Sequence, residues 1–254
     1  MESEVQIKLS DYTLLDKIGQ GASGEVFRIK ENKTGEIYAA KISFKPFSAN
    51  SRTEKISLVR ELNIMAKISH PNIVKFVGYS PTNLQNEDKP VIITELVTNG
   101  TLGYILEQER KSLSPALWDD THKLINIYGI ASAMLFLHSH DIIHRDLKPA
   151  NILMTDELYP KIADFGLSKK VDLQEQDSLN IQSTIGMKGT PLYMSPEILS
   201  ESKYTKACDV YAYGMIVYEI ITGEIPFKGL NFYQITANLI KNERPAFPEK
   251  TPPA

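Results

Sequence analysis

One segment, residues 142–166, constrains this chain more than any other, because it holds three separated polar residues around two short apolar runs. The apolar runs, residues 152–154 and 161–163, predict two short buried strands joined by a turn. Asp146 and Asn151 precede the first strand, and Asp164 directly follows the second. An order of loop, strand, turn, strand and loop allows these three side chains to converge at one strand edge.

The chemistry of these side chains indicates what they bind. Two carboxylates and an amide around one cavity suit a divalent cation that takes oxygen ligands, whereas zinc would favour His or Cys. Lys148 stands two residues after Asp146 and adds a positive charge that can stabilise an anionic group. The combination indicates phosphoryl transfer.

The composition is that of an ordinary globular protein. The 254 residues are enough for one large domain or two small ones, with 42% hydrophobic and 23% charged residues. A net charge of -3 argues against a nucleic-acid binder held by a basic patch. The single cysteine, Cys208, excludes an internal disulfide framework, favours a reducing compartment and is expected to be a structural, part-buried thiol.

No targeting or membrane segment is predicted. Residues 1–11 are acidic and polar, unlike a signal peptide, and no apolar run has the length needed to span a bilayer. We therefore expect a cytoplasmic protein.

The first part of the chain has strand-like patterns. Strands are predicted at residues 12–15, 25–29, 37–43, 73–79 and 91–96, and a helix at residues 51–68. The prediction is a five-stranded antiparallel sheet with one helix.

The second part is mainly helical. Helices are predicted at residues 102–110, 118–138, 209–223 and 231–241, and the polar residues 168–188 are predicted to form a loop. The helix at 209–223 is apolar nearly all round, as a helix at the centre of a lobe would be. For the helix at 118–138 the expected inner face is Leu124, Ile127, Tyr128, Ala131, Leu135 and His138.

The glycines Gly19, Gly21 and Gly24 are a weak signal when taken alone. An ordinary flexible hairpin and a dinucleotide-binding loop would both show them. A dinucleotide site requires a helix after the glycines, but residues 25–29 continue as a strand and Lys41 stands on the next strand. A glycine-rich hairpin of this kind can lie over phosphates, with Lys41 pairing with their charge.

Taken in order, these motifs resemble those of the eukaryotic protein kinase family, from residue 12 to about residue 254. The resemblance rests on the glycine loop 19–26, the Tyr38-Ala39-Ala40-Lys41 strand, Glu61, residues 144–151, Asp164-Phe165-Gly166, residues 189–197 and residues 209–214. It implies an α+β, bilobal fold: a leader at 1–11, an N-lobe at 12–94, a hinge at 95–101 and a mainly helical C-lobe at 102–254.

The resemblance also implies a role for each catalytic residue. Asp146 would accept or orient the proton of the substrate hydroxyl, and Lys148 would neutralise charge on the transferred phosphoryl group. Asn151 and Asp164 would hold Mg²⁺. Further roles are implied for Lys41, which would orient the α and β phosphates, for Glu61, which would pair with Lys41, and for Thr190, which would bond Asp146 and Lys148.

ATP is the implied nucleotide. The adenine pocket would include apolar side chains and the hinge backbone, while the glycine loop would cover the phosphates. These nucleotide-binding residues are Ile18, Gly19, Gln20, Gly21, Ala22, Ser23, Gly24, Glu25, Val26, Ala39, Lys41, Thr94, Glu95, Val97 and Leu153. For Val26, Ala39 and Leu153, core packing is an equally good explanation, and both roles are expected.

Substrate type and control also follow from the resemblance. Lys148-Pro149 and Gly189-Thr190-Pro191 are similar to serine/threonine kinases, and residues 73–78 and 224–227 to the tyrosine-kinase-like branch. The implied partners are protein substrates with Ser or Thr. Arg145 goes with control by activation-loop phosphorylation, by an upstream kinase or a second copy, and the candidate sites are Ser178, Ser183 and Thr184.

One departure concerns the end of the chain. In the family, further helices follow the Pro-rich residues 244–248 and carry an arginine that pairs with the residue matching Glu197. These helices are absent from the 254 residues. We therefore expect exposed apolar surface on the helix at 209–223, an unpaired Glu197 if that residue is buried, and poor folding of the chain alone.

Two alternatives to a protein serine/threonine kinase stay open at this point. The first is a catalytically impaired, nucleotide-binding scaffold, which the intact catalytic residues disfavour and the missing helices favour. The second is a small-molecule kinase of similar fold, which the complete segment 189–197 disfavours because that segment suits a peptide platform.

Overall fold

The computed structural model describes residues 5–21, 24–44, 62, 65–164, 169–170, 192–201, 204–249 and 251. The chain divides into two compact units, Met1–Thr98 and Asn99–Ala254. The division falls inside the predicted hinge, residues 95–101. Each unit is described by itself below.

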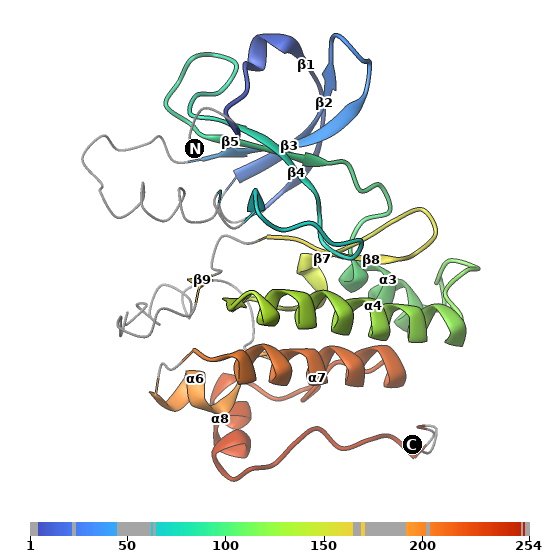
Figure 1. Ribbon diagram of the computed structural model, residues 1–254. Coiled ribbons are helices and arrows are strands. Elements are labelled where there is room, and N and C mark those ends of the chain that lie inside the picture. Colours follow the sequence, from blue (N-terminus) through green and yellow to red (C-terminus); the bar gives the residue numbers. More distant parts are fainter. Residues whose placement is uncertain are drawn as a thin grey trace. The chain divides into compact units, whose positions relative to one another are not determined.

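The first unit is built on an antiparallel sheet (Figure 1). Its strands are β1 (Tyr12–Gln20), β2 (Gly24–Glu31), β3 (Ile37–Ser43), β4 (Phe76–Ser80) and β5 (Val91–Glu95), preceded by the short 3-10 helix η1 (Leu9–Asp11). The strand order is β1-β2-β3-β5-β4, and every pair is antiparallel. The predicted five-stranded antiparallel sheet is therefore confirmed.

Apolar residues on one face of this sheet form the core of the first unit. Ile29, Ala40, Val91 and Ile93 are buried there, each 2% exposed or less. The predicted strand at 73–79 begins too early, because Ile73 closes a turn through its backbone N–H, which donates to the His70 carbonyl at 3.1 Å. The helix predicted at 51–68 lies largely outside the described residues.

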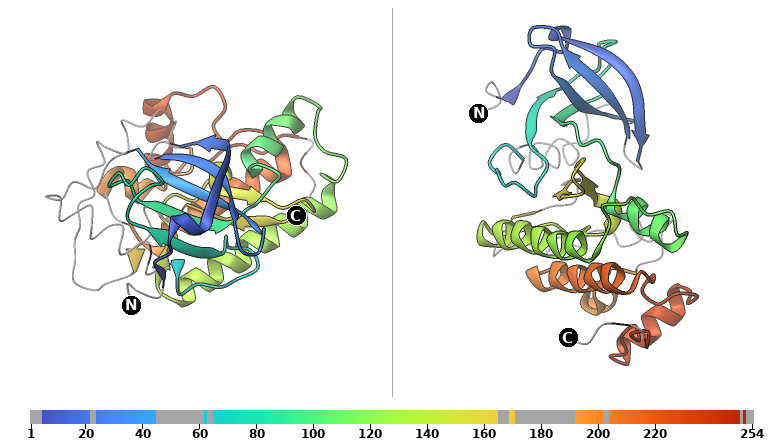
Figure 2. Two further views of the ribbon diagram at one scale, coloured as in Figure 1. Left: turned by 90° about the horizontal axis from the view of Figure 1, so that it is seen from above. Right: turned by 90° about the vertical axis from the view of Figure 1, so that its right-hand side faces the viewer.

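The second unit is mainly helical. Its helices are α3 (Leu102–Arg110), α4 (Asp120–Ser139), η2 (Pro149–Asn151), α6 (Pro196–Glu201), α7 (Lys206–Thr222) and α8 (Phe232–Ile240). Its short strands are β6 (Ile142–Ile143), β7 (Ile152–Met154), β8 (Pro160–Ile162) and β9 (Lys169–Lys170), in the pairs β6–β9 and β7–β8. Helices α4 and α7 run side by side in both views (Figures 1 and 2).

Helix capping explains most of the helix bounds. Helix α3 matches its predicted range, and the Thr101 side chain caps it by accepting from the Tyr104 N–H at 3.1 Å. Helix α7 starts three residues before the predicted Asp209, because Thr205 and Cys208 form a capping box. It ends at Gly223, whose φ of 69° is left-handed and suits glycine.

The predicted inner face of α4 is wrong. Leu124, Tyr128 and Leu135 are 56%, 74% and 72% exposed. The residues that are buried instead are Asn126, Ile130, Ala133, Met134 and Leu137.

The buried polar residue in this set explains the error. Asn126 is fully buried because its Nδ2 donates to the His122 and Leu158 carbonyls, both at 2.8 Å. A prediction from apolar periodicity assigns an asparagine to the solvent side of a helix. The predicted inner face is then shifted along the helix by one residue.

The corrected face of α4 can be tested with two leucines that differ in burial. Leu137→Ala should cost about 2–5 kcal/mol of stability, because it leaves a cavity at a fully buried site. Leu135→Ala, on the exposed face, should change stability by less than about 0.5 kcal/mol. Denaturant unfolding of both variants measures this difference, and equal losses would contradict the assigned face.

Candidate functional site

Three of the predicted catalytic residues meet where the loop after β6 enters η2, whose last residue is Asn151. The Lys148 Nζ lies 2.9 Å from Asp146 Oδ1 and 2.7 Å from Asp146 Oδ2. The Asn151 Nδ2 donates to Asp146 Oδ2 at 2.9 Å and to the Asp146 carbonyl at 2.7 Å. Asp146 is therefore held in one orientation by a cation and an amide, with about a third of its side chain exposed.

Local packing fixes the two ends of this loop. Before it, Ile142 and Ile143 are buried on β6, and within it Leu147 is 2% exposed. After it, Pro149 starts the 3-10 turn η2, where its missing N–H costs nothing. The polar side chains stand between these apolar anchors, which hold the backbone that carries them.

A backbone hydrogen bond brings Asp164, the second carboxylate, close to Asn151. The Ala163 N–H donates to the Asn151 carbonyl at 2.9 Å, next to the pairing of Ile152 with Ile162. Asp164 is the next residue, with a left-handed φ of 63°. The turn between β7 and β8 thus returns the chain to Asn151, as the segment 142–166 predicted.

This donor set fits Mg²⁺. The Asn151 Nδ2 is committed to Asp146, so Oδ1 is the atom of that side chain that can face a cation. Together with the Asp164 carboxylate it would provide oxygen ligands, which Mg²⁺ takes in small number alongside substrate phosphates.

A carboxylate that sequence reasoning did not assign to the site supports this loop. Asp209 on α7 is 1% exposed, and its Oδ2 and Oδ1 accept from the backbone N–H groups of His144 at 2.8 Å and Arg145 at 2.9 Å. The Nε2 of His138, at the end of α4, lies 2.9 Å from Oδ2. An aspartate in a largely apolar helix was the available signal, because a buried carboxylate requires partners of this kind.

The Arg145 guanidinium lies on an aromatic ring. Its Cζ is 5.0 Å from the centre of the Tyr204 ring, which is within the range of a cation–π contact. Burial raises the pKa of the Tyr204 phenol, and the charge of Arg145 partly offsets this. The Arg145 backbone has a left-handed φ of 71°, at the residue just before Asp146.

In the first unit, several predicted nucleotide-binding residues share one sheet face. Lys41 on β3 lies opposite Val26 on β2, and Ala39 lies opposite Thr94 on β5. Residues paired across antiparallel strands point to the same face, and Ala40, between Ala39 and Lys41, points to the buried core. The structure therefore gathers Val26, Ala39, Lys41 and Thr94 on the face opposite the core.

The glycine-rich hairpin joins β1 and β2, with Gln20 paired to Glu25 and Gly19 to Val26. The Lys17 Nζ crosses this hairpin, donating to Gln20 Oε1 at 2.8 Å and Glu25 Oε1 at 2.7 Å. A Cβ on Gly24 would lie 2.2 Å from the Ile42 carbonyl oxygen, so only glycine fits there. Gly21 donates its N–H to the Gly24 carbonyl at 2.9 Å.

The remaining predicted adenine-site residues are placed as follows. The Glu95 N–H donates to the Lys75 carbonyl at 2.9 Å, so the Glu95 backbone can offer a ligand only its carbonyl. Val97 is half-buried and Ile18 is 44% exposed. In the second unit, Leu153 on β7 forms a bridge with Thr101.

Some predicted residues lie outside the described part of the chain. They are Ala22, Ser23, Glu61 and Thr190 of the site, and the candidate phosphorylation sites Ser178, Ser183 and Thr184.

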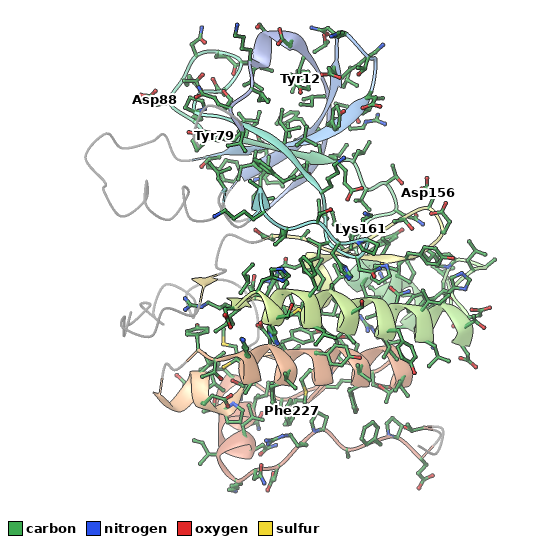
Figure 3. All side chains as sticks on the ribbon, in the orientation of Figure 1. Tyr12, Tyr79, Asp88, Asp156, Lys161 and Phe227 are labelled. Atoms are coloured by element: carbon green, nitrogen blue, oxygen red, sulfur yellow. The ribbon has the colours of Figure 1, made fainter. Side chains whose placement is uncertain are left out.

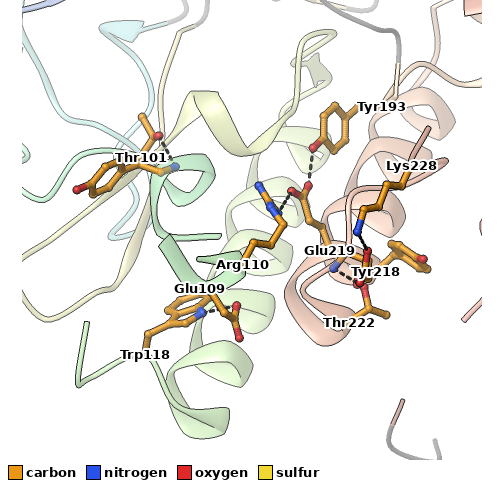
Figure 4. A network of polar contacts seen from close by, with 11 residues as sticks. Thr101, Glu109, Arg110, Trp118, Tyr193, Tyr218, Glu219, Thr222 and Lys228 are labelled. Carbon is orange, nitrogen blue, oxygen red and sulfur yellow. Dashed lines mark hydrogen bonds and ion pairs between the residues drawn. The ribbon is translucent and has the colours of Figure 1, made fainter. Parts of the chain in front are cut away.

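A buried ion-pair network joins α3, α7 and the residues before α6 (Figure 4). The Arg110 NH1 lies 2.9 Å from Glu219 Oε1, and Glu219 is 3% exposed. The Tyr193 hydroxyl donates to Glu219 Oε2. Burial, followed by the charge of Glu219, raises the pKa of the Tyr193 phenol, which therefore stays a donor.

Glu197 and the lone cysteine also form a contact. Glu197 is half-buried, and the buried Cys208 thiol donates to its Oε1 at 3.5 Å. The predicted structural role of Cys208 is therefore confirmed. On α7, the residues Val210 and Ile221 are 60% and 39% exposed.

Removing the cation of the Glu219 network should be more harmful than removing both charges. Arg110→Met leaves Glu219 buried without its cation and should cost about 3 kcal/mol. The double variant Arg110→Met/Glu219→Gln should recover more than half of that loss, because no buried charge then remains. Chemical denaturation measures both, and a double variant no more stable than the single one would contradict this reading.

Within the described ranges, no helix is both long enough and apolar enough to cross a lipid bilayer.

Comparison with known proteins extends to almost the whole chain. Residues 12–251 match a family model described as "Protein kinase domain". A "Probable LIM domain-containing serine/threonine-protein kinase" of Dictyostelium discoideum is 36% identical over 93% of this chain and 34% of its own length. Serine/threonine-protein kinase 36 of Pongo abelii is 34% identical over 92% of this chain and 16% of its own length. Cysteine-rich receptor-like protein kinase 10 of Arabidopsis thaliana is 34% identical over 91% of this chain and 32% of its own length. The chain thus spans about a third or less of the length of these relatives.

Proposed function

Because the chain belongs to the protein kinase family, we propose that it transfers the γ-phosphoryl group of ATP to Ser or Thr hydroxyls of protein substrates. The observation that carries this proposal is the Asp146–Lys148–Asn151 cluster. The relatives named as serine/threonine-protein kinases support the substrate type. The tyrosine-kinase-like branch is our proposal for the position of this chain within the family.

Asp146 acts on the substrate hydroxyl. Its Oδ2 accepts from two donors, Lys148 and Asn151, whereas among the described residues Oδ1 accepts from Lys148 alone. Oδ1 therefore has more room to accept the hydroxyl proton, and the fixed carboxylate orients the oxygen for attack. Lys148, already beside this carboxylate, neutralises charge on the phosphoryl group as it moves.

Asn151 and Asp164 hold Mg²⁺ through side-chain oxygens. When bound, Mg²⁺ neutralises phosphate charge and orients the phosphates. Asp209 fixes the backbone at His144 and Arg145, so that Asp146 meets the substrate in a constant position. Glu61 and Thr190 are proposed to orient Lys41 and Asp146, respectively.

In the first unit, ATP binds through one face of the sheet. Val26, Ala39 and Thr94, which share a sheet face with Lys41, line the adenine site, and Lys41 pairs with the phosphates. The amides of the glycine hairpin cover the phosphates, and the Lys17–Glu25 ion pair steadies that hairpin. The Glu95 carbonyl and the Val97 N–H bond the adenine edge.

Control by phosphorylation is part of the proposal. Arg145 lies next to Asp146, and a guanidinium can bind a phosphate bidentately. An upstream kinase or a second copy of this chain would phosphorylate Ser178, Ser183 or Thr184.

We also propose that the protein acts in the cytoplasm, in intracellular signalling. The single free thiol, Cys208, supports a reducing compartment.

The alternative of a catalytically silent scaffold has no observation in its favour. The proposed catalytic residues Asp146, Lys148 and Asn151 are all present in the sequence, and both Lys148 and Asn151 donate to the Asp146 carboxylate.

Phosphoryl transfer is tested with radiolabelled ATP and a protein rich in Ser and Thr. Asp146→Asn should lower incorporation by about 10²–10⁴-fold, because it removes the proton acceptor. The control, Asp156→Asn, changes an exposed aspartate ten residues further on and should retain activity. Equal incorporation by all three proteins would refute the catalytic function, and phosphotyrosine as the main product would refute the substrate type.

Phosphorylation control predicts that replacing Ser178, Ser183 and Thr184 together by Ala lowers activity at least about fivefold, because Arg145 then has no phosphate to bind. Phosphatase treatment of the unaltered protein should have the same effect and should not affect the variant. Full activity in the triple variant would exclude this form of control.

A further inference from the structure

The outer edge of the sheet in the first unit is already occupied. Strand β4 is the last strand in the order β1-β2-β3-β5-β4, and β5 uses one of its sides. An open strand edge offers unpaired N–H and C=O groups to other chains. On its other side, Gln6 forms a parallel bridge with Tyr79, the residue labelled at this edge in Figure 3, and the Ile7 N–H donates to the Tyr79 carbonyl at 2.9 Å.

Side chains of this N-terminal segment, residues 5–9, alternate in burial up to Leu9, the first residue of η1. Val5, Ile7 and Leu9 are half-buried, whereas Gln6 and Lys8 are exposed. A period of two is what an extended segment shows when one of its faces is covered. Ile7 and Leu9 pack against the core cluster Ile29, Ala40, Val91 and Ile93.

A glycine on β4 makes room for the segment. A Cβ on Gly78 would lie 2.4 Å from Ile7 Cγ2 and 3.3 Å from the Val5 carbonyl oxygen. The φ angle of Gly78 is not positive, so close approach of the segment, rather than backbone conformation, requires glycine here.

The far end of the segment is fastened to the turn after β2. The Asn32 N–H donates to the Asp11 carbonyl at 2.9 Å, and its Nδ2 donates to the Ser10 carbonyl at 3.3 Å. The Thr13 hydroxyl donates to Asn32 Oδ1 at 2.6 Å. Residues 5–11 are thus bonded at both ends, although they precede the range 12–251 that the family model matches.

We propose that the outer edge of β4 is a docking groove for an extended peptide with apolar residues at alternate positions, and that this chain fills it with its own N-terminal segment. The recognition elements are the Tyr79 backbone, the space above Gly78 and the apolar core that receives Ile7 and Leu9. The segment belongs to the folded first unit. The groove does not depend on phosphoryl transfer, so the peptide binding measured below should be the same in a chain that also carries Asp146→Asn.

Stability of the full chain is the first test. Ile7→Asp should lower the midpoint of thermal unfolding by about 4–10 °C, because it places a charge against the core. The control, Gln6→Asp, introduces the same charge at an exposed neighbour and should shift the midpoint by less than about 2 °C. Gly78→Val should also lower it by several degrees, although valine otherwise favours strands. Equal shifts for the two aspartate variants would overturn the proposal.

Peptide binding is the second test. A fluorescent peptide with the sequence of residues 1–11 should bind the Ile7→Asp variant, in which the groove is vacated, at least about tenfold more tightly than the unaltered chain. Adding Gly78→Val should abolish that binding. Binding that is insensitive to Gly78→Val, or absent from the Ile7→Asp variant, would overturn the proposal.

Hydrogen exchange on the unaltered chain is the third test, and it requires no variant to fold. The Ile7 amide should exchange at least about 100-fold more slowly than an unstructured amide, because it is bonded to Tyr79. Exchange at the unstructured rate would overturn the proposal. So would dimerisation of the unaltered chain that is lost in Gly78→Val, because the groove would then take a second copy.

Discussion

The catalytic loop depends on one buried carboxylate. Asp209 accepts two backbone hydrogen bonds from consecutive residues, His144 and Arg145, at 2.8 and 2.9 Å. Burying a charge in a largely apolar helix is unfavourable unless it is compensated in this way. The loop and the helix α7 are therefore coupled. If they separated, the buried carboxylate would lose its donors and the two N–H groups would lose their acceptor. Asp146 follows directly, so a side chain on α7 helps to set its position.

Much of the fold and of the site was readable in the sequence because the relevant signals are local. Alternation of apolar residues predicted the sheet. The predicted start of α3 and end of α7 lie beside local capping residues, Thr101 and Gly223, respectively. The catalytic cluster was predictable for the same reason, since Asp146, Lys148 and Asn151 lie within six residues of one another. These hydrogen bonds form within one short segment, so they require only that this segment adopt one conformation.

The features that were missed or misplaced depend on tertiary contacts. The inner face of α4 was misplaced because Asn126 is buried by bonds to carbonyls, one of them at Leu158, which is distant in sequence. Asp209 was not assigned to the site because its partners lie 64 and 65 residues away. The alternation of Val5, Ile7 and Leu9 was present in the sequence, but a segment this short is convincing only beside the strand that it covers.

The backbone at Glu95 has a consequence for the chemistry of ligands. Its N–H donates to the Lys75 carbonyl within the first unit, while its own carbonyl accepts from the Thr94 hydroxyl at 3.2 Å. A heterocycle that binds here must present a hydrogen-bond donor to residue 95, as an exocyclic amine does. One that presents a lone pair at the same place would meet a carbonyl oxygen and be repelled. At the proposed adenine site, this strand pairing would therefore favour ligands that carry an amine at this position over ligands that carry a bare lone pair there.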